Sequence, residues 1–495
     1  MLNNKKRVIA LILAILTAFA VFAGCAKNNN NNTVQTSGSA AEDDDYRTLV
    51  PQGYNAGGFE FVILNAGDFE IKGCLNDIVI TDYDSTSNDY VSEAMYNRNA
   101  TIENKLNCAI SEINDSSGVL VSKIDDSRQA GTDDYSLCNI IGNNIYGAAN
   151  NGLLYNLNSL PYVDLTRDWW TQGAIEAYTL NHLLFYCSSD LTICDDEATC
   201  IVMYNRTVAK DYKLESPEEM YELVTKGGWT WEKFFASAKK VSAGGDNGDG
   251  VLSDGDMFGC IVCDWSYIGM MVGAGCHFSE KEDNDDDRLR VAFGDEKFVN
   301  VLDRLVDYTK NKRAFLATLY DGKFTHDHFG SNEALMIMQV VAHIRNARAT
   351  EDDFGVLPMP KYDEKQDNYY SYTNRTCYLG VPVTIGDPDK VGAILEELTA
   401  LSSKIVIPAY LDRSIGDKFM RDPGSKRMIP YIFGHTVYDT LVTTVGWDTV
   451  FGSFSSMLKS RQNMVVVVER KYGAYINNLL NESWEAYSKL GADYA

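Results

Sequence analysis

Residues 136–146 read SLCNIIGNNIY, and this stretch decides the predicted fold. Its first six residues are nearly all apolar, which is typical of a strand buried on both faces of a parallel sheet. A polar segment led by glycine follows directly, as at the end of such a strand. The pattern therefore predicts a sheet that is covered by helices on both sides.

The residues before this strand alternate between strand and helix patterns. Val91, Met95, Ile102 and Leu106 recur at helical spacing. Together the patterns predict a parallel α/β lobe over the first 150 residues, with strands at 59–65 and 108–113 and helices at 90–106 and 120–128.

The expected carboxyl ends of these strands carry polar side chains. Asp68 follows the first strand, and Asn143, Asn144 and Tyr146 follow the strand at 136–141. Ligands of open α/β sheets bind beyond the carboxyl ends of the strands. Two interpretations stay open: these residues contact a ligand, or they cap helices.

Residues 1–25 have the pattern of an export signal. A basic tripeptide at 5–7 precedes an apolar run at 8–22, and small residues then lead to Cys25. The run is shorter than the roughly 20 residues that a spanning helix needs. An uncleaved signal anchor or a spanning helix is the alternative. The end of the run, FAGC, resembles the lipobox of bacterial lipoproteins, although Phe22 stands where leucine is usual.

The lipobox resemblance implies cleavage before Cys25 and a diacylglycerol on its sulfur. Acyl chains such as palmitate would then tether the protein to the membrane. Residues 25–57 include five consecutive asparagines and a run of acids, which predicts a disordered linker after the anchor.

The charge balance argues against a nucleic-acid partner. The chain has 44 Lys and Arg against 69 Asp and Glu, which gives a formal net charge of −25. Such a surface repels phosphate backbones, and the sequence contains no basic cluster to offset the repulsion.

Eleven cysteines are many for this length. Most of them, such as Cys138 and Cys200, lie in apolar stretches, where a free thiol packs as a small hydrophobic group. Cys260 and Cys263 form a C-x-x-C within a strand-like run, and an offset of three puts their side chains on opposite faces. The pattern favours buried free thiols, while disulfide pairing outside the cytoplasm stays open.

Residues 245–256 match much of a twelve-residue calcium loop, with Gly250 at the position of the sharp turn. The pattern departs at two places: Gly245 stands at the first position, where an acid is expected, and Asp256 stands at the twelfth, where glutamate normally binds with both oxygens. The alternative is an Asp/Gly turn without an ion. The predicted calcium ligands are Asn247, Asp249, the carbonyl of Val251, Ser253 and Asp256, and no other cofactor is predicted.

Catalytic motifs are absent from the sequence. It contains no P-loop, no G-x-S-x-G, no H-E-x-x-H and no G-x-G-x-x-G after a strand. Among 69 acids some carboxylates will be close by chance, so a pair of them is weak support for glycoside hydrolysis. The sequence therefore offers aromatic and amide side chains at the expected strand ends, but no assembled nucleophile and base.

Several segments, taken in order, resemble an extracellular solute-binding lipoprotein of a bacterial ABC importer, of the carbohydrate-binding, family 1-like type. These segments are GLL at 152–154, MYNR at 203–206, WTWEKF at 229–234, the loop at 245–259 and DFGVLPMPK at 353–361.

The resemblance implies an α/β, two-lobed fold of the periplasmic-binding-protein type (type II), in which crossing strands join the lobes at a hinge. The implied parts are a signal peptide at 1–24, a linker at 25–57, an N-terminal lobe of 58–190 and 340–386, and a C-terminal lobe of 191–339 and 387–495.

The resemblance also implies a function without catalysis. A monomer held by lipid on the outer face of the cell membrane would capture a sugar or oligosaccharide in the cleft between its lobes. Hinge closure would then present the loaded protein to the permease. A peptide-binding or other polar solute-binding protein, a surface glycoside hydrolase and an adhesin without a closing cleft are the alternatives.

By position, the loops with Asp68 and with Asn143, Asn144 and Tyr146 resemble cleft loops of this family, and Glu197 lies just before a crossing strand. Aromatic faces pack on the apolar side of a sugar ring, while amides and carboxylates bind its hydroxyls. Each aromatic candidate could equally belong to the core. The aromatic candidates for ligand contact are Trp169, Trp170, Trp265, Tyr267 and Tyr372.

Overall fold

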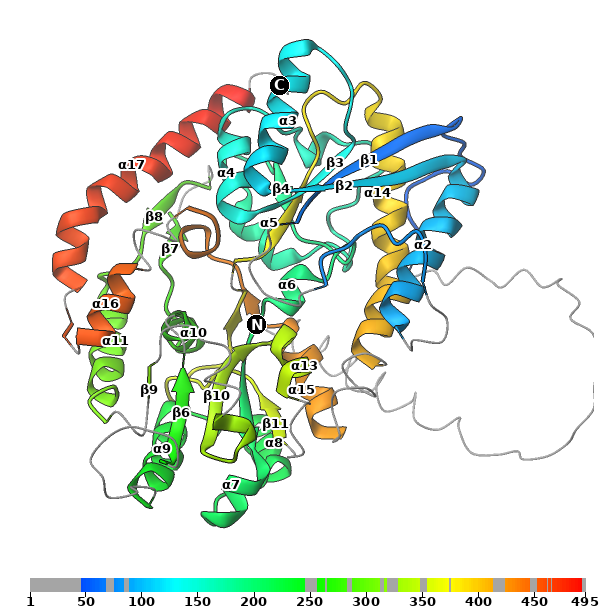
Figure 1. Ribbon diagram of the computed structural model, residues 1–495. Helices are drawn as coiled ribbons and strands as arrows, with labels where there is room; N and C mark the ends of the chain where they lie inside the picture. Colours follow the sequence, from blue (N-terminus) through cyan, green and yellow to red (C-terminus); the bar gives the residue numbers. More distant parts are fainter. Residues whose placement is uncertain are drawn as a thin grey trace, which may run out of the picture. The chain divides into compact units, whose positions relative to one another are not determined.

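Two five-stranded sheets organise the computed structural model (Figure 1). We call the elements packed around each sheet the first lobe and the second lobe. The structure describes residues 46–67, 75–83, 89–244, 256–262, 265–282, 287–311, 316–317, 328–347, 354–373, 375–412, 423–445, 452–460, 462–463 and 465–491.

The first sheet has the strand order β2-β1-β3-β13-β4. Its central strand β3 is buried at all five positions, as the apolar run predicts. β1 pairs in parallel with β2 and β3, whereas β13 pairs antiparallel to β3 and β4. The strands are β1 (Phe59–Ala66), β2 (Cys108–Asp115), β3 (Leu137–Ile141), β4 (Tyr186–Cys187) and β13 (Cys377–Gly380).

Helices with clear start signals cover this sheet. α2 (Tyr90–Leu106) begins after Asp89, whose side chain accepts a hydrogen bond from the Ser92 backbone N–H. α14 (Pro388–Leu401) begins after Asp387 in the same way and packs against α2 and β1 (Figure 1). The first lobe also contains α3 (Ser117–Ala130), α4 (Gly142–Asn150) and α5 (Gln172–Tyr178).

The second sheet has the order β11-β5-β10-β6-β9. α9 (Trp231–Gly244) lies so close to β6 that a Cβ atom at Gly259 would be 2.3 Å from the Ala238 carbonyl oxygen. Glycine at this position therefore sets the helix-to-sheet distance. The strands are β5 (Cys200–Asn205), β6 (Phe258–Val262), β9 (Leu316–Ala317), β10 (Ala334–Val340) and β11 (Phe354–Leu357).

The strand pairing divides the chain differently from the predicted lobe boundaries. Residues 340–386 were expected in one lobe, but β11 pairs with β5 of the second sheet and β13 completes the first. Residues 387–495 were expected in the other lobe, but α14 packs on the first sheet. Both differences arise because the chain crosses between the sheets at points that carry no local sequence signal.

A long helix contacts both lobes. α17 (Val465–Gly491, red in Figure 1) packs on the first lobe where the Tyr487 ring meets Phe185 at 4.7 Å. It contacts the β7–β8 hairpin where Asn477 Oδ1 accepts from the Val291 backbone N–H at 3.3 Å. α17 therefore packs against parts of the chain that belong to different lobes.

The remaining elements are short or lie between the sheets. They are η3 (Leu157–Ser159), α6 (Cys194–Glu197), α7 (Arg206–Asp211), α8 (Pro217–Thr225), α10 (Ser266–Gly273), β7 (Ser279–Lys281), β8 (Leu289–Val291), α11 (Glu296–Tyr308), η4 (Val341–His343), α13 (Ile344–Ala347), β12 (Ser371–Tyr372), η5 (Ser402–Val406), α15 (Pro423–Phe433), β14 (Thr436–Val437), η7 (Leu441–Val445) and α16 (Gly452–Ser460).

The cysteines that the structure describes are free thiols, and all but Cys108 are buried. Burial raises the pKa of Cys138 to about 12, so this thiol stays protonated. Free thiols in the core match the prediction for these residues. No helix in the described ranges is long and apolar enough to cross a membrane, and the export signal and Cys25 lie outside those ranges.

Candidate functional site

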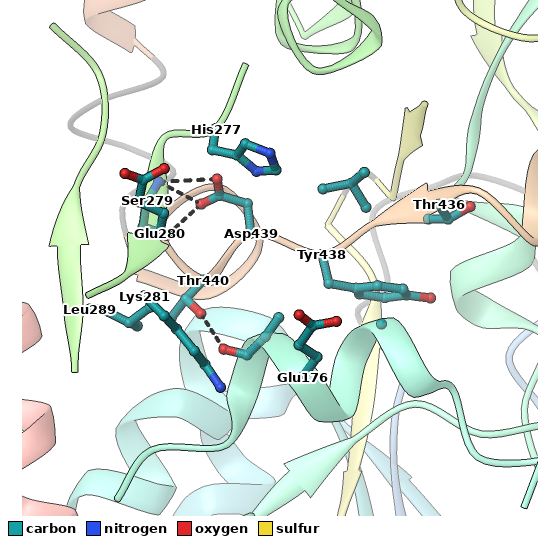
Figure 2. A pocket seen from close by; sticks show the side chains of 13 residues that line it. Glu176, His277, Ser279, Glu280, Lys281, Leu289, Thr436, Tyr438, Asp439 and Thr440 are labelled. Atoms are coloured by element: carbon teal, nitrogen blue, oxygen red, sulfur yellow. Dashed lines mark hydrogen bonds between the residues drawn. The ribbon is translucent and has the colours of Figure 1, made fainter. Parts of the chain in front are cut away.

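A pocket of about 370 Å³ lies between three separate parts of the chain (Figure 2). α5 of the first lobe forms one wall, the β7–β8 hairpin forms the second, and residues 436–440 form the third. Its lining is Gly173, Glu176, Ala177, His277, Ser279, Glu280, Lys281, Leu289, Thr436, Val437, Tyr438, Asp439 and Thr440.

Asp439 fastens two of these walls together (Figure 2). Its carboxylate accepts hydrogen bonds from the backbone N–H groups of Phe278 at 2.7 Å and Ser279 at 3.1 Å, and from the Ser279 hydroxyl at 2.7 Å. It also accepts from the Leu441 N–H at 3.0 Å, within its own turn. The side chain is buried. A buried carboxylate with this many donors is fixed in place and serves as a structural anchor of the pocket.

The hairpin is held to the second lobe by aromatic packing. Phe278, directly before β7, meets Phe298 of α11 at 5.0 Å and Phe454 of α16 at 5.4 Å, both edge to face. Tyr308 of α11 stacks on Phe235 of α9, the helix that covers β6. These contacts assign the hairpin wall to the second lobe.

The third wall is held to the first lobe. The Thr440 hydroxyl donates to the Ala177 carbonyl of α5 at 3.0 Å (Figure 2). The Tyr178 hydroxyl is 2.7 Å from the Thr443 hydroxyl and donates to the Tyr378 hydroxyl of β13 at 2.7 Å. The pocket therefore lies where first-lobe elements meet the second-lobe hairpin, as in a cleft that lobe closure would tighten.

Tyr438 connects the pocket to the acidic turn before β5. Its ring lines the pocket, and its hydroxyl donates to Asp195 Oδ2 of α6 at 2.7 Å. Burial raises the pKa of Asp195 to about 6, although the hydrogen bond from Tyr438 opposes the shift. The pocket wall and the acidic turn are thus in direct contact.

The acidic turn also holds Glu197, a predicted ligand residue. Its fully buried carboxylate pairs with Arg345 of α13, with Oε1 2.6 Å from one guanidinium nitrogen. The pair joins α6 to the segment that follows β10 of the second sheet. Both oxygens of Glu197 accept from Arg345, so the structure places this residue in an ion pair.

Trp169 and Trp170, also predicted to contact ligand, lie in a closed cluster. Their indole N–H groups donate to the two carboxylate oxygens of Glu396, at 3.2 Å and 3.0 Å respectively. All three side chains are buried. Burial raises the pKa of Glu396 to about 7, although both indole hydrogen bonds favour its charged form.

The other described candidates also lie away from the pocket. Tyr372 and Tyr267 are buried, and the Tyr372 hydroxyl donates to the carbonyl of the nearly buried Trp265 at 3.0 Å. Tyr146 packs against α17, where its hydroxyl meets Ser483.

Asn143 is exposed and Asn144 is half-buried at the start of α4. None of the predicted ligand residues in the described ranges lines the pocket. Ligand contact by these residues stays a prediction.

The residues that do line the pocket were missed by the sequence analysis. Tyr438 and Asp439 combine an aromatic ring with a carboxylate, the two kinds of group that suit a sugar, and this was the available signal. Nothing local distinguishes the pair from many similar ones, because its position depends on Phe278 and Ser279, far away in the sequence.

Asp68, Asn247, Asp249, Val251 and Ser253 lie outside the described residues. Asp256 is described and fully buried. The described part of the chain contains no group of three His, Cys, Asp or Glu residues able to hold a metal ion. The calcium site stays a prediction.

Comparisons with known proteins agree with this architecture. The family model described as bacterial extracellular solute-binding protein matches residues 100–399. No curated protein matches the sequence significantly.

Two solved structures share the fold. A cyclo/maltodextrin-binding protein, complexed with maltotetraose, has a TM-score of 0.54 at 12% identity, covering 87% of this chain and 96% of that chain. An ABC substrate-binding protein from Listeria monocytogenes, complexed with cycloalternan, has a TM-score of 0.52 at 13% identity, covering 88% and 99%.

The fold and the pocket thus define a two-lobed solute-binding protein. The chain belongs to the bacterial extracellular solute-binding protein family, since the family model covers more than half of its length. Membership implies a location outside the cytoplasm. The likeness to the two solved structures establishes the fold.

Proposed function

We propose that this protein captures a saccharide in the pocket between α5, the β7–β8 hairpin and residues 436–440, and delivers it to the permease of an ABC importer. The observation that carries the proposal is a pocket built from both lobes, with hydroxyl, carboxylate and imidazole groups around one tyrosine ring. Such groups suit the alternating polar and apolar faces of a sugar.

Further support comes from the fold. The two solved structures that resemble the chain hold maltotetraose and cycloalternan. A binding protein needs a pocket and lobes that close, and it leaves the solute unchanged. Closure around the solute would mark the loaded state for the permease.

The test is a thermal-shift screen of the purified protein with neutral oligosaccharides, including maltotetraose, and with tripeptides. A bound solute raises the melting temperature by mass action. We expect at least one saccharide and no peptide to raise it. Stabilisation by peptides alone would remove the saccharide assignment, and release of reducing ends during incubation would show a hydrolase.

The proposal includes a lipid anchor at Cys25, supported by the lipobox-like end of the export signal. Cys25→Ser should shift the protein from the membrane fraction to the soluble fraction, while Cys108→Ser should not. Membrane fractionation of Cys25→Ser like that of the unchanged protein would contradict the anchor.

It also includes a structural calcium ion held by residues 245–256. Chelation should lower the melting temperature, and added Ca²⁺ but not Mg²⁺ should restore it, because the pattern offers several flexible oxygen ligands. An unchanged melting temperature would favour an empty turn. The expected monomer is checked by light scattering.

A further inference from the structure

Five carboxylate, amino or imidazole side chains line the pocket: Glu176, His277, Glu280, Lys281 and Asp439. They come from all three walls, so a bound solute would meet each of them. Which of them are available to a solute depends on what already binds them within the protein.

Three of the five are already engaged. Asp439 accepts from the backbone N–H groups of β7 and its own turn. Glu280 pairs with Arg290 of the neighbouring strand β8. Lys281 Nζ is 3.0 Å from Asp287 Oδ1. The two ion pairs offset the charges of Glu280 and Lys281, and the hydrogen bonds satisfy the oxygens of Asp439, without a ligand.

Glu176 and His277 differ from these three. Both side chains are exposed, and no hydrogen bond or ion pair joins either to another described residue. Glu176 lies on α5 of the first lobe, and His277 lies directly before β7 on the second-lobe hairpin. Figure 2 shows their side chains coming from different walls of the pocket.

We infer that Glu176 and His277, one from each lobe, form hydrogen bonds to the solute. Together they would select a neutral, hydroxyl-rich solute. The inference rests on the proposed function and deepens it. A carboxylate accepts hydrogen bonds from hydroxyl groups, and an imidazole can donate to or accept from them. A neutral saccharide supplies both partners and can bridge the two walls.

The same pair disfavours anionic solutes. Glu176 would repel a uronate or the carboxylate end of a peptide, and the formal net charge of −25 adds to the repulsion. The cation that could compensate, Lys281, is bound to Asp287. Selection against anions therefore follows from the pairing of the lining charges.

The experiment measures dissociation constants by calorimetry for the full-length protein and four variants. The probes are neutral gluco-, manno- and xylo-tetrasaccharides, with trigalacturonate as the anionic counterpart. The variants are Glu176→Gln, His277→Gln, Glu280→Gln and Glu232→Gln. Glu280 lines the pocket but is paired, and Glu232 is exposed on α9 outside it.

We expect Glu176→Gln and His277→Gln each to weaken binding of the neutral probe about tenfold, the usual cost of a hydrogen bond to a charged or polar group. Glu280→Gln should weaken it less, and Glu232→Gln should not change it. Trigalacturonate should bind the unchanged protein at least tenfold more weakly than the best neutral probe.

The outcomes separate the two proposals. Suppose that the unchanged protein binds a neutral probe and that Glu176→Gln and His277→Gln bind it equally well. Then Glu176 and His277 do not contribute to solute binding, and the proposed function stands. Equal affinity for trigalacturonate overturns the charge selection alone. If no saccharide binds, the proposed function and the inference both fail. Circular dichroism confirms that the exposed substitutions leave the fold intact.

Discussion

Glu396 and Asp439 are both buried carboxylates, yet one lies at the centre of a closed cluster and the other lies beside an open pocket. Glu396 accepts from the indoles of Trp169 and Trp170 and completes a closed cluster. Asp439 accepts from the backbone N–H groups of Phe278, Ser279 and its own turn, and joins two walls of a pocket. Glu396 binds the indole N–H groups of the aromatic side chains around it, whereas the ring of Tyr438, beside Asp439, lines the pocket.

The difference teaches how far residue type indicates a ligand site. Adjacent tryptophans are the stronger sequence signal for sugar contact, yet their polar atoms are bound inside the protein. Tyr438 stands beside Asp439, which is a weaker signal, yet its ring lines the pocket. The hydroxyl of Tyr438 is also bound within the protein, to Asp195, so the difference lies in burial: both indoles are enclosed, whereas Tyr438 is half-buried and lines the pocket.

The sharpest test of the closed cluster is Trp170→Ala, with the largest expected effect. It should lower the free energy of unfolding by about 4 kcal/mol, because it leaves a cavity and removes a donor from Glu396. Urea denaturation measures the loss. Trp484→Ala, at a half-buried position on α17, is the control with a smaller loss. A direct ligand role would instead appear as weaker binding with near-normal stability.

Asp439→Ala tests the pocket in the same way. The change leaves the N–H groups of Phe278 and Ser279 without their acceptor, and we expect a loss of about 3 kcal/mol in unfolding free energy. Saccharide affinity should fall as well, because the two walls are no longer fastened. Asp439→Asn keeps the shape and one acceptor oxygen, so it should lose less. Normal affinity in Asp439→Ala would show that the walls are fixed by other contacts.

Acids whose pKa values are raised by burial, among them Glu396, Asp195 and Asp190, predict how stability depends on pH. Glu396 has a pKa of about 7 and Asp195 of about 6. The folded chain keeps these protons at pH values where the unfolded chain has lost them. Stability should therefore fall as pH rises from about 4 to about 7, and then level off, with about 3 kcal/mol from Glu396.

Denaturation curves between pH 4.5 and 8, measured for the unchanged protein and for Glu396→Gln, check this prediction. The variant should have a flatter dependence over the same range, whereas Glu232→Gln, at an exposed site, should follow the unchanged protein. An equal slope in Glu396→Gln would mean that this carboxyl group is ionised within the folded cluster.

The smallest expected effect is that of Gly173→Ala in the pocket wall. A Cβ atom there would lie 3.3 Å from Tyr438 Cδ2, so the ring must shift slightly. The crowding opposes the gain in helix propensity in α5, and the net change in stability should stay within about 1 kcal/mol. Gly173→Leu, which fills the pocket, should abolish saccharide binding. Full affinity in Gly173→Leu would move the binding site elsewhere.

Local patterns predicted the first lobe well. The apolar run at 136–141 is β3, which is buried at every position, and the parallel pairing of β1 with β2 and β3 matches the predicted lobe. The apolar run depends on side chains within one strand, and the alternation of strand and helix patterns indicates the parallel pairing, so the sequence contains this information directly.

Features that depend on distant contacts were not predictable from local patterns. The resemblance correctly placed β13 in the first lobe, but nothing near residue 377 indicates that its partner is β3. The pocket was missed for the same reason, because Asp439 finds its donors beside β7. Ligand contact was predicted for Trp169 and Trp170 from residue type and for Glu197 from its position before a crossing strand, without knowledge of Glu396 or Arg345.

The position of β13 between β3 and β4 has a consequence for biosynthesis. Both neighbours are made long before residue 377, so the first sheet cannot be completed while that residue is still in the ribosome. Until then β3 and β4 lack a shared partner, and their unpaired edges are open to wrong pairing. A nascent chain destined for export thus stays incompletely folded for most of its synthesis, the state that passage through a narrow translocation channel requires.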